Sequence, residues 1–539
     1  MNKSKLLLIF FLISFNSLLF SQQFNMILTG DPVIEDIHYL SVASGKSFLS
    51  FSSPLSPYEI RNFLNSIDES SLSPSAKEAY SRIEKRLTPE KQPLSLALDD
   101  IFSFILNINA SVEGKARTNN DISWYPRYPE NLPLLSFPLQ LFFSNIAQLY
   151  IEPTIGLRYR DQSSDNFDSN IPLGAEHFNV QFWPIRSFAA FGGSFWNFQI
   201  GRDRLFFGTG HTGSLSFSNN STFFDFTRLS LFSPHVKYSL MIIQMPLKIS
   251  DNLFPENFID WNSADVTETT QRYFYLHCLD ISLFNKFSIN LMEGVLVGNA
   301  PIELKYLNPL ILFHSLYSWT DYETWNPGKY NGSGHMVGSF FSLEINYNII
   351  KNLSLYGQFV MNQFALPGEI ENGDQAPNGL AYMLGINFTH SFNLWGSIFY
   401  LEFIYTDPYF QILATPFGSF IQMEHENYYL IGYPRDTISL SLGTEFFLKD
   451  TLRLSGIFSW ILSGVRSKDL WDWENTNIHR TPSGIAENKF IISLGADWKP
   501  VLNLTLSANV TGIYSHNNKN ISGKNNAGAQ FTLSANYKF

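Results

Sequence analysis

The sequence predicts an all-β fold, an outer-membrane antiparallel β-barrel of about 18 strands with a short N-terminal periplasmic helical segment. Charged residues make up only 15% of the 539 residues, against about 25% in an average soluble protein. Aromatic residues reach 16%, yet after the N-terminus no apolar run is long enough for a membrane-spanning helix. A barrel in a membrane needs this composition, because its outward residues meet hydrocarbon and its inward residues are expected to meet water.

Period-two alternation supports the strands. In the C-terminal segment 529–539 every odd position is apolar and every even position is polar, which is typical of a strand with one wet face. Segments 343–349, 438–442 and 502–510 show the same pattern. The predicted strands are 101–113, 134–143, 147–160, 174–184, 187–201, 222–231, 236–247, 271–284, 287–298, 338–349, 353–364, 379–391, 394–406, 437–449, 451–463, 489–499, 502–514 and 527–539.

The connections between these strands alternate in length. The short ones are 284–287, 350–352, 391–393, 449–451 and 499–501. The long ones are 248–270, 299–337, 365–378, 407–436, 464–488 and 515–526. Outer-membrane barrels pair short periplasmic turns with long extracellular loops, so all the long connections are expected on the outer side.

Before the barrel, the sequence predicts a signal peptide and a helical segment. Residues 1–21 resemble a secretory signal peptide, with Lys3 and Lys5 before an apolar run; a short membrane anchor is the alternative. Residues 22–98 are predicted to form the periplasmic helical segment, and 99–539 the barrel. Ser56-Pro57-Tyr58-Glu59 has capping-box spacing, and Ser73-Pro74 opens a second helix. Two such helices are expected to dock on each other and against the barrel base, or to plug it.

Charge and cysteine content narrow the function. The net charge of −11 argues against nucleic acid and anionic lipid headgroups as partners. The single cysteine, Cys278, excludes an intrachain disulfide and a CxxC metal site, and it is expected to pack as a small apolar side chain. The histidines show no H-x-x-x-H spacing on a helix, so we predict neither a metal nor a cofactor.

The stretch Gly208-Thr209-Gly210-His211-Thr212-Gly213 spells the G-x-G-x-x-G pattern of a dinucleotide-binding turn. That pattern requires a helix after the last glycine and a surrounding βαβ unit. The residues that follow, 214–222, are poor in helix formers. We therefore interpret the glycines as permitting a tightly packed loop between two barrel strands, which turns at the extracellular end and can fold inward to close the lumen.

Three stretches of this sequence resemble one bacterial family, the Wzi-type capsule-assembly outer-membrane proteins. They are segment 201–220 with its Gly-Arg start and Ser-Asn end, Glu293-Gly294, and segment 306–310. The resemblance implies a non-enzymatic surface lectin that holds exported capsular polysaccharide on the cell. It also implies that Phe539 is an assembly signal. The expected partners are therefore capsular or other surface polysaccharide, outer-membrane lipid, and the barrel-assembly machinery during biogenesis.

Candidate ligand-binding residues follow from sugar chemistry. Aromatic faces stack on the C–H surfaces of sugars, while amides, carboxylates and arginines reach their hydroxyl groups. Predicted long loops hold such mixtures around 317–325 and 471–475, although these aromatics also suit the interfacial girdle of a barrel. The predicted polysaccharide-binding residues are Arg202, Arg204, His211, Asn219, Asn220, Trp319, Trp325, Trp471 and Trp473.

Two other functions stay open at this point. A barrel this wide can enclose an aqueous channel, so a porin-like channel for passive solute uptake is the alternative function. Acids at 251–260 and 424–426 resemble the carboxylates of glycan-active enzymes, and His211 with Ser214 resembles a base and nucleophile. No third orienting residue accompanies that pair, so we predict no catalytic residues and no enzyme activity.

Overall fold

The structure is a computed structural model of the chain. It describes residues 24–88, 95–98, 101–122, 132–157, 167–171, 178–218, 223–245, 247–248, 269–270, 272–298, 302–310, 337–363, 378–412, 420–422, 428–429, 434–467 and 480–539.

The strands form a closed antiparallel barrel. The first strand is interrupted and consists of β2 (Phe102–Leu106) and β3 (Asn109–Arg117), and the second consists of β4 (Leu135–Ser136) and β5 (Leu139–Phe143). The ring continues through β6 (Ala147–Leu157), β8 (Phe178–Gly193), β9 (Trp196–Asp203), β10 (Phe224–Phe232), β11 (Val236–Gln244), β14 (Arg272–Leu283), β15 (Phe287–Gly298), β16 (Val337–Ile350), β17 (Leu353–Gln363), β18 (Gly379–Phe392), β19 (Trp395–Thr406), β22 (Thr437–Leu448), β23 (Leu452–Ser463), β24 (Glu487–Val501), β25 (Leu504–His516) and β26 (Asn526–Lys538). β26 pairs with β3, from Gln530 opposite Arg117 to Lys538 opposite Asn109, which closes the ring.

Counted over the described residues, with each interrupted strand taken as one, the barrel has 18 strands, as predicted. Small additions are β1 (Ser95–Leu98) on β2, β7 (Phe167–Ser169) on β3, and the two-stranded pairs β12 (Leu247–Lys248) with β13 (Thr269–Thr270) and β20 (Ile421–Gln422) with β21 (Tyr428–Tyr429).

Two predicted turns are wrong in position. The sequence placed a turn at 185–186, but β8 runs through to Gly193 and the turn lies at 194–195. A register shift between Glu152 and Thr154, in the pairing of β6 with β8, absorbs the irregularity there without ending the strand. The turn predicted at 499–501 lies at 502–503, because β24 extends to Val501.

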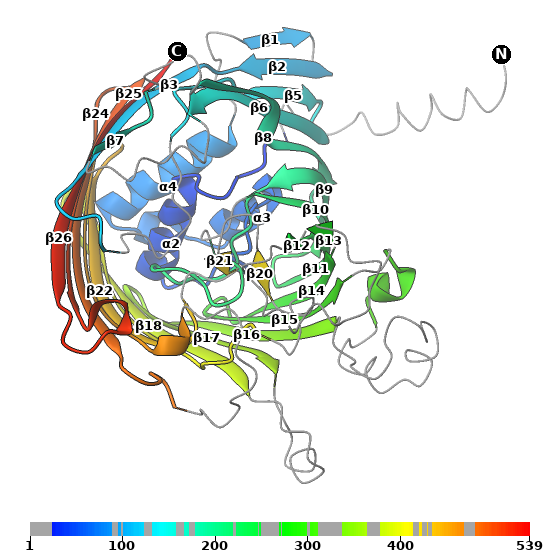
Figure 1. Ribbon diagram of the computed structural model, residues 1–539. Coiled ribbons are helices and arrows are strands. Elements are labelled where there is room, and N and C mark those ends of the chain that lie inside the picture. Colours follow the sequence, from blue (N-terminus) through cyan, green and yellow to red (C-terminus); the bar gives the residue numbers. More distant parts are fainter. Residues whose placement is uncertain are drawn as a thin grey trace, which may run out of the picture.

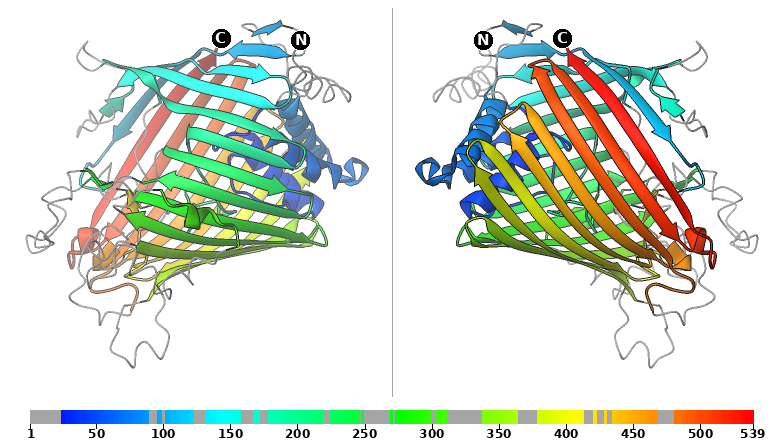
Figure 2. Two further views of the ribbon diagram at one scale, coloured as in Figure 1. Left: turned by 90° about the vertical axis from the view of Figure 1, so that its right-hand side faces the viewer. Right: turned by 90° about the vertical axis from the view of Figure 1, so that its left-hand side faces the viewer.

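The connections sort by length to the two ends of the barrel. Short turns at 144–146, 194–195, 233–235, 284–286, 351–352, 393–394, 449–451 and 502–503 lie at one end, which we call the short-turn end. The other end, the long-loop end, carries the connections that span 204–223, 299–336 and 407–436. This alternation was predicted, and Figure 2 shows the strands running obliquely between the two ends.

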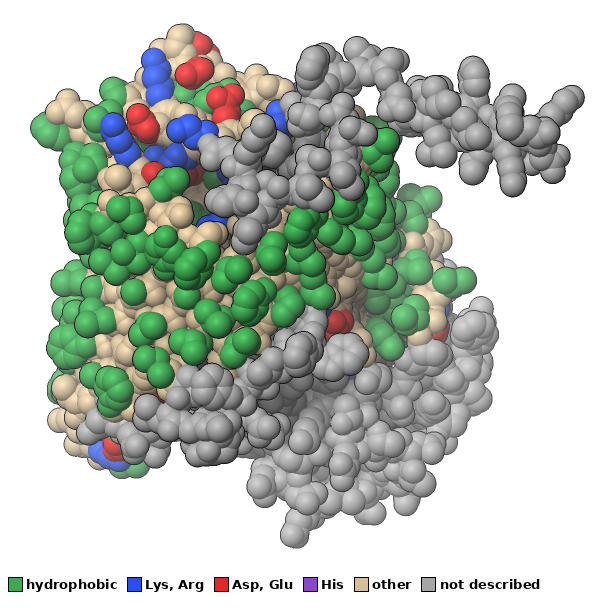
Figure 3. Space-filling model, turned by 90° about the horizontal axis from the view of Figure 1, so that it is seen from above, with side chains coloured by type: hydrophobic (Ala, Val, Ile, Leu, Met, Phe, Trp, Pro, Cys, Tyr) green, Lys and Arg blue, Asp and Glu red, His purple; other side chains and the backbone are tan. Residues whose placement is uncertain are grey.

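The outer surface of the wall is apolar. Along β18, for example, Leu384 and Phe388 point outward and are 63% and 48% exposed, while the residues that precede them, Met383 and Asn387, are buried. Figure 3 shows apolar side chains spread over the face of the barrel in that view, with charged side chains gathered along one edge. Among the described residues, no helix is long and apolar enough to cross a membrane.

In the described part of the chain, three helices precede the barrel: α2 (Val33–Ser44), α3 (Pro57–Asn65) and α4 (Pro74–Leu87). The predicted capping box is present, since Ser56 accepts from the Tyr58 backbone N–H and Glu59 accepts from the Ser56 N–H. Ser73 caps α4 as expected. The sequence interpretation missed α2, although Val33, Ile37 and Leu40 lie on one helical face and Gly45 ends the helix with a left-handed conformation.

The helices lie inside the ring of strands, toward the short-turn end (Figure 1). The Ser47 N–H donates to the Asn285 carbonyl and the Asn352 N–H donates to the Val42 carbonyl, so the helical segment contacts two short turns directly. The Tyr39 ring packs edge-on against Phe447 of β22 at 4.6 Å. The N-terminal segment therefore plugs the barrel rather than resting beneath it.

Buried charges hold this segment in place. Nζ of Lys237 on β11 lies 2.5 Å from Glu59 of α3, and both side chains are almost fully buried. Arg228 on β10 donates to the carbonyls of Ser52 and Pro54. Each cation points inward from the wall and meets an acceptor of the N-terminal segment, so the plug and the wall satisfy each other's polar groups.

Replacing the lysine of this buried pair tests its role. Lys237→Met leaves the Glu59 carboxylate buried without its partner, so we expect a loss of about 3–5 kcal/mol in the free energy of unfolding. Urea unfolding in detergent micelles measures it. The control is Lys519→Met, which breaks the exposed pair with Asp121 and is expected to cost at most about 1 kcal/mol. Equal losses in the two variants contradict the role assigned to the buried pair.

Candidate functional site in the barrel lumen

The connection after β9 folds into the barrel. Its described part, residues 204–218, is here called the inner loop. Phe206 and Ser53 exchange backbone hydrogen bonds, Ser53 N–H to the Phe206 carbonyl at 2.9 Å, which joins the inner loop to the N-terminal segment. The Phe207 N–H donates to the Phe217 carbonyl, so the loop doubles back on itself. The predicted inward fold of the glycine-rich segment is thus confirmed for the described residues.

The inner loop brings four large side chains into an apolar core inside the barrel: Leu205, Phe207, Leu215 and Phe217 are each at most 1% exposed. The wall contributes buried inward residues to the same core, among them Phe226, Met241, Phe274, Met292, Phe340, Val360 and Met383. Cys278 belongs to this core, so its expected packing role is confirmed. The expectation that inward residues meet water is wrong for this part of the wall, because the chain itself fills the space.

Glycines permit the close folding of the inner loop. Gly208 and Gly213 have φ values of +136° and +150°, which side-chain-bearing residues rarely adopt. A Cβ atom on Gly210 would lie 2.1 Å from the Gly213 carbonyl oxygen. The motif that mimics a dinucleotide turn is thus a packing device, and the chain continues from it into strand β10 rather than into a helix.

Glu402 of β19 holds the tip of the inner loop. Its carboxylate accepts from the backbone N–H groups of His211 at 2.9 Å and Thr212 at 3.2 Å. The Thr212 hydroxyl and the Tyr356 hydroxyl of β17, the latter at 2.7 Å, donate to it as well. One buried carboxylate therefore satisfies four donors, two of which are backbone groups of the loop.

A second polar group anchors the return limb of the loop. Gln358 of β17 accepts from the Leu215 N–H at 2.7 Å, and its amide lies 3.1 Å from the Ser216 hydroxyl. Glu344 of β16 accepts from the Thr209 hydroxyl at 3.2 Å and from the Gln358 amide at 3.3 Å. The wall thus provides acceptors where the loop brings donors, which is required where water is excluded.

His211 lies against aromatic rings from two elements. Its ring stacks on Tyr400 of β19 at 4.1 Å and 2°, and its Nε2 lies 2.9 Å from Oδ1 of Asn387. His38 of α2 lies 4.7 Å away, ring centre to ring centre. Burial lowers the pKa of His211 to about 4, and burial together with the neighbouring His211 lowers the pKa of His38. Both rings are therefore neutral near pH 7, which lets them pack together.

The described candidate residues occupy different surroundings. Arg202 points outward from β9 and pairs with Asp225 of β10 at 2.7 Å, so its partner is a surface acid rather than an interior one. The Arg204 guanidinium lies over the Phe223 ring at 4.8 Å, at the start of the inner loop. His211 is deep in the lumen. The structure does not bring these three side chains together in one site.

The remaining candidates, Asn219, Asn220, Trp319, Trp325, Trp471 and Trp473, lie outside the described residues, as do the acids at 251–260 and 424–426. Their assignment stays a prediction. Among the described residues, no group of three or more His, Cys, Asp or Glu side chains is arranged to hold a metal ion.

Sequence reasoning missed the wall residues that hold the inner loop, Glu344, Gln358, Asn387 and Glu402. A signal existed, since each is a polar residue at an inward position of an alternating strand. Alternation alone assigns such residues to a wet lumen. It does not reveal that a distant loop supplies their partners.

Two further family-like stretches also have structural roles. Gly294 of β15 faces Phe274, whose ring would lie 2.4 Å from an added Cβ atom. Tyr306, in the 3-10 helix Leu304–Leu307, stacks on Tyr275 at 4.7 Å and is 1% exposed. These residues pack against neighbouring side chains of the barrel wall and do not form a reactive site.

The fold and the lumen together define a class of protein: an outer-membrane β-barrel whose described interior is occupied by its own chain. Comparison with known protein families identifies the family to which the chain belongs. The family model of the capsule assembly protein Wzi matches residues 135–440. The match covers more than half of the chain, so the protein belongs to the Wzi capsule-assembly family.

One solved structure of the same family shares the fold. The chain is similar to an Escherichia coli structure described as "Wzi, an outer membrane protein involved in group 1 capsule assembly, is a carbohydrate binding beta-barrel". That likeness has 14% identity, covers 95% of this chain and 99% of the other, and has a TM-score of 0.57. Pseudomonas aeruginosa OccD3 (OpdP) aligns at 8% identity over 81% of this chain and 91% of its own, with a TM-score of 0.43. No curated protein matches the chain.

Removing the loop anchor tests whether it keeps the lumen closed. Glu402→Leu leaves the His211 and Thr212 N–H groups without their acceptor, at a cost of about 2–4 kcal/mol to loop docking. We expect current fluctuations in planar bilayers that the wild type lacks. Asp450→Asn, at an exposed short turn, is the matched loss of one carboxylate and is expected to behave as wild type. A Glu402→Leu barrel that shows no current fluctuations contradicts the anchoring role of Glu402.

Loop docking is expected to weaken on acidification. A displaced loop has His211 with an ordinary pKa near about 6.5, while the docked ring has a pKa of about 4. Stabilisation is complete above the ordinary pKa and is lost as the pH falls toward 4, because only the displaced state binds the proton readily. Two protonated rings at 4.7 Å would also repel. We expect a loss on the order of 1–2 kcal/mol.

Hydrogen exchange of residues 204–218 at pH 7.5 and 5.0, corrected for intrinsic rates, measures this effect. The double variant His38→Gln/His211→Gln should lose most of the pH dependence. The exposed His516→Gln is the matched control and should retain it. Identical pH dependence in the double variant rules out the two histidines as its source.

Proposed function

We propose that this protein is a non-enzymatic outer-membrane protein that binds surface polysaccharide and promotes attachment and assembly of a capsule. Membership of the Wzi capsule-assembly family carries the proposal. The E. coli relative is described as a carbohydrate-binding barrel, and the shared fold makes the same class of ligand reasonable here. The apolar core around the inner loop supports it, because a protein that holds polymer at the surface needs no open lumen.

The proposed orientation places the short-turn end in the periplasm and the long-loop end outside the cell. Residues 1–21 then act as the signal peptide, 22–98 contain the periplasmic plug, and 99–539 form the barrel. Lipid contacts the apolar wall, and the assembly machinery acts on the chain during biogenesis. Tryptophans 319, 325, 471 and 473 belong to connections assigned to the outer side in this orientation. They remain the proposed glycan contacts, together with Asn219 and Asn220.

A porin-like channel is the competing function. It requires a continuous water-filled path, and the described lumen instead contains three helices, the inner loop and a core of buried aromatic and aliphatic side chains. The Phe274 ring centre lies 5.6 Å from those of Phe217 and Phe340, and a lumen packed with these buried rings is unsuited to solute passage. The distribution of apolar residues therefore favours a closed barrel.

One experiment separates the two functions. We expect deletion of the gene to release polymer from the cell surface into the medium, and wild-type complementation to restore cell-associated polysaccharide. Replacing Trp319, Trp325, Trp471 and Trp473 together by Ala is expected to reduce retention by at least about tenfold, since stacking contributes about 0.5–1.5 kcal/mol per aromatic.

Trp395→Ala, at the short-turn end, is the matched tryptophan control and should retain polymer. Steady ohmic conductance of the purified wild-type barrel, together with unchanged retention in the deletion strain, would support the porin instead.

A further inference from the structure

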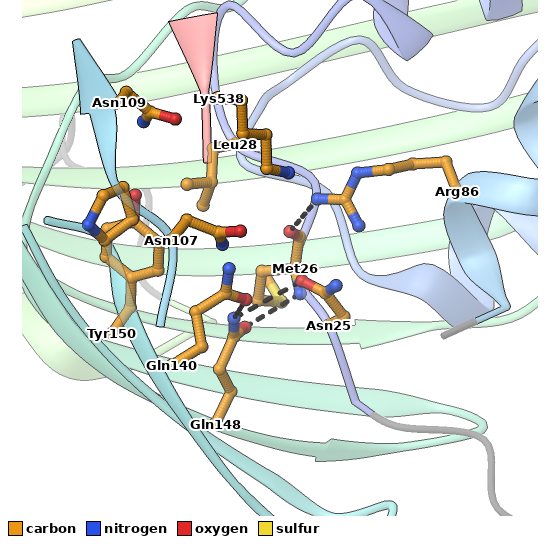
Figure 4. A pocket seen from close by; sticks show the side chains of 11 residues that line it. Asn25, Met26, Leu28, Arg86, Asn107, Asn109, Gln140, Gln148, Tyr150 and Lys538 are labelled. Carbon is orange, nitrogen blue, oxygen red and sulfur yellow. Dashed lines mark hydrogen bonds between the residues drawn. The ribbon is translucent and has the colours of Figure 1, made fainter. Parts of the chain in front are cut away.

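A cavity lies inside the barrel at the short-turn end, opposite the long-loop end. It has a volume of about 280 Å³ and lies between the N-terminal segment, the end of α4 and the inner face of the wall at β2, β3, β5, β6 and β26. Its lining residues are Asn25, Met26, Leu28, Arg86, Asn107, Asn109, Pro138, Gln140, Gln148, Tyr150 and Lys538 (Figure 4).

Carboxamides dominate the lining, and no carboxylate is among the lining residues. Gln148 is fixed: its Oε1 accepts from the Met26 N–H at 2.9 Å, and its amide donates to Gln140 at 3.1 Å. Asn109 donates to Ser136 at 3.1 Å. These contacts orient the side chains and leave further donor and acceptor positions of the amides facing the cavity.

Asn107 is the exception to this satisfied network. It is 6% exposed, it lines the cavity, and no hydrogen-bond partner of its carboxamide is found among the described residues. Its carboxamide is not among the fully buried polar atoms that lack a partner, so it is open to the cavity. A bound ligand with hydroxyl groups would satisfy it.

Two cations face the same space. Arg86 at the end of α4 is held by Asp31 at 2.8 Å and by the Met26 carbonyl. Lys538, on the inward face of the last strand, makes no ion pair among the described residues. In Figure 4 both side chains extend toward the cavity that the carboxamides line. The site therefore combines a positive end with a row of groups that both donate and accept.

We propose that this cavity binds one acidic sugar unit, a monosaccharide that carries a carboxylate. Lys538, with Arg86 behind it, would receive the carboxylate, and Asn107, Asn109 and Gln140 would receive the hydroxyls. The volume lies just below the range of about 300–1,000 Å³ for drug-sized ligands, which suits a single ring. The proposal rests on the proposed function and deepens it: it adds an acidic sugar as ligand class and a second contact at the opposite end of the barrel.

Inorganic phosphate is also an anion, but its oxygens act mainly as acceptors. Five carboxamides each present a donor and an acceptor, which matches sugar hydroxyls better than phosphate oxygens. The test therefore uses two comparison ligands, inorganic phosphate and an uncharged sugar.

The test uses the full-length barrel in detergent, with glucuronate, glucose and inorganic phosphate as probes in saturation-transfer NMR and titration calorimetry. We expect glucuronate to bind at least tenfold more tightly than either of the others. Lys538→Gln should weaken glucuronate at least tenfold. Lys499→Gln removes one positive charge at an exposed short turn and should bind as wild type.

Because Lys538 precedes the terminal Phe539, Lys538→Gln is first checked for heat-modifiable migration as a folded barrel. Asn107→Asp is a second variant, which places a like charge beside the expected carboxylate and should abolish glucuronate binding while leaving the strand ends unchanged. Equal affinity for glucuronate and glucose, equal affinity for phosphate, or full binding by folded Asn107→Asp overturns the proposal.

Cell-associated polysaccharide distinguishes this proposal from the function it rests on. If the wild-type barrel retains polymer on cells but does not bind glucuronate in solution, the cavity proposal fails and the capsule function stands. If the wild type binds glucuronate but the deletion strain retains its polymer, the capsule function fails.

Discussion

The structure depends on filling a wide barrel without water. Eighteen strands enclose more space than inward side chains alone can occupy, so the interior must be hydrated or packed with chain. Here the inner loop and the N-terminal segment pack it. Phe207 and Phe217 of the loop meet Phe274 of the wall, and Tyr39 of α2 meets Phe447. Dispersion and burial of apolar surface then stabilise the lumen as they stabilise the core of a soluble protein.

Excluding water places strict demands on polar groups. Every charge that the wall turns inward needs a hydrogen-bond or ion-pair partner, and the pairs that join the wall to the filling chain span large sequence distances: Lys237 with Glu59, and Glu402 with the backbone at His211. Such pairs fix the position of the plug more than they add net stability, because desolvation offsets much of their attraction. The cavity near Lys538 differs, since the Asn107 carboxamide and the Lys538 ammonium that line it have no hydrogen-bond or ion-pair partner among the described residues.

The sequence predicted which types of residue and which loop form the candidate site, but not how they are arranged in space. The glycine spacing at 208–213 predicted a tightly packed loop, and the inward fold was among its expected consequences. Glu402 and Gln358 were visible only as polar residues of alternating strands, because a strand pattern reports which face a side chain occupies and not what lies across the lumen. Arg202 and Arg204 are adjacent to the loop in sequence, yet one faces outward and the other lies at the lumen entrance.

By itself the sequence determined the barrel, its strand number, its closure by the last strand and the two capped helices, because these follow from local periodicity, turn chemistry and composition. Only the tertiary structure decided that β8 runs past 185–186, that α2 completes the plug, and that the lumen is apolar around Phe274. Those features arise from tertiary contacts between residues separated in the sequence, such as Glu152 with Arg186 and Ser53 with Phe206. Sequence periodicity does not reveal such contacts, because they are determined by how the side chains pack in the folded barrel.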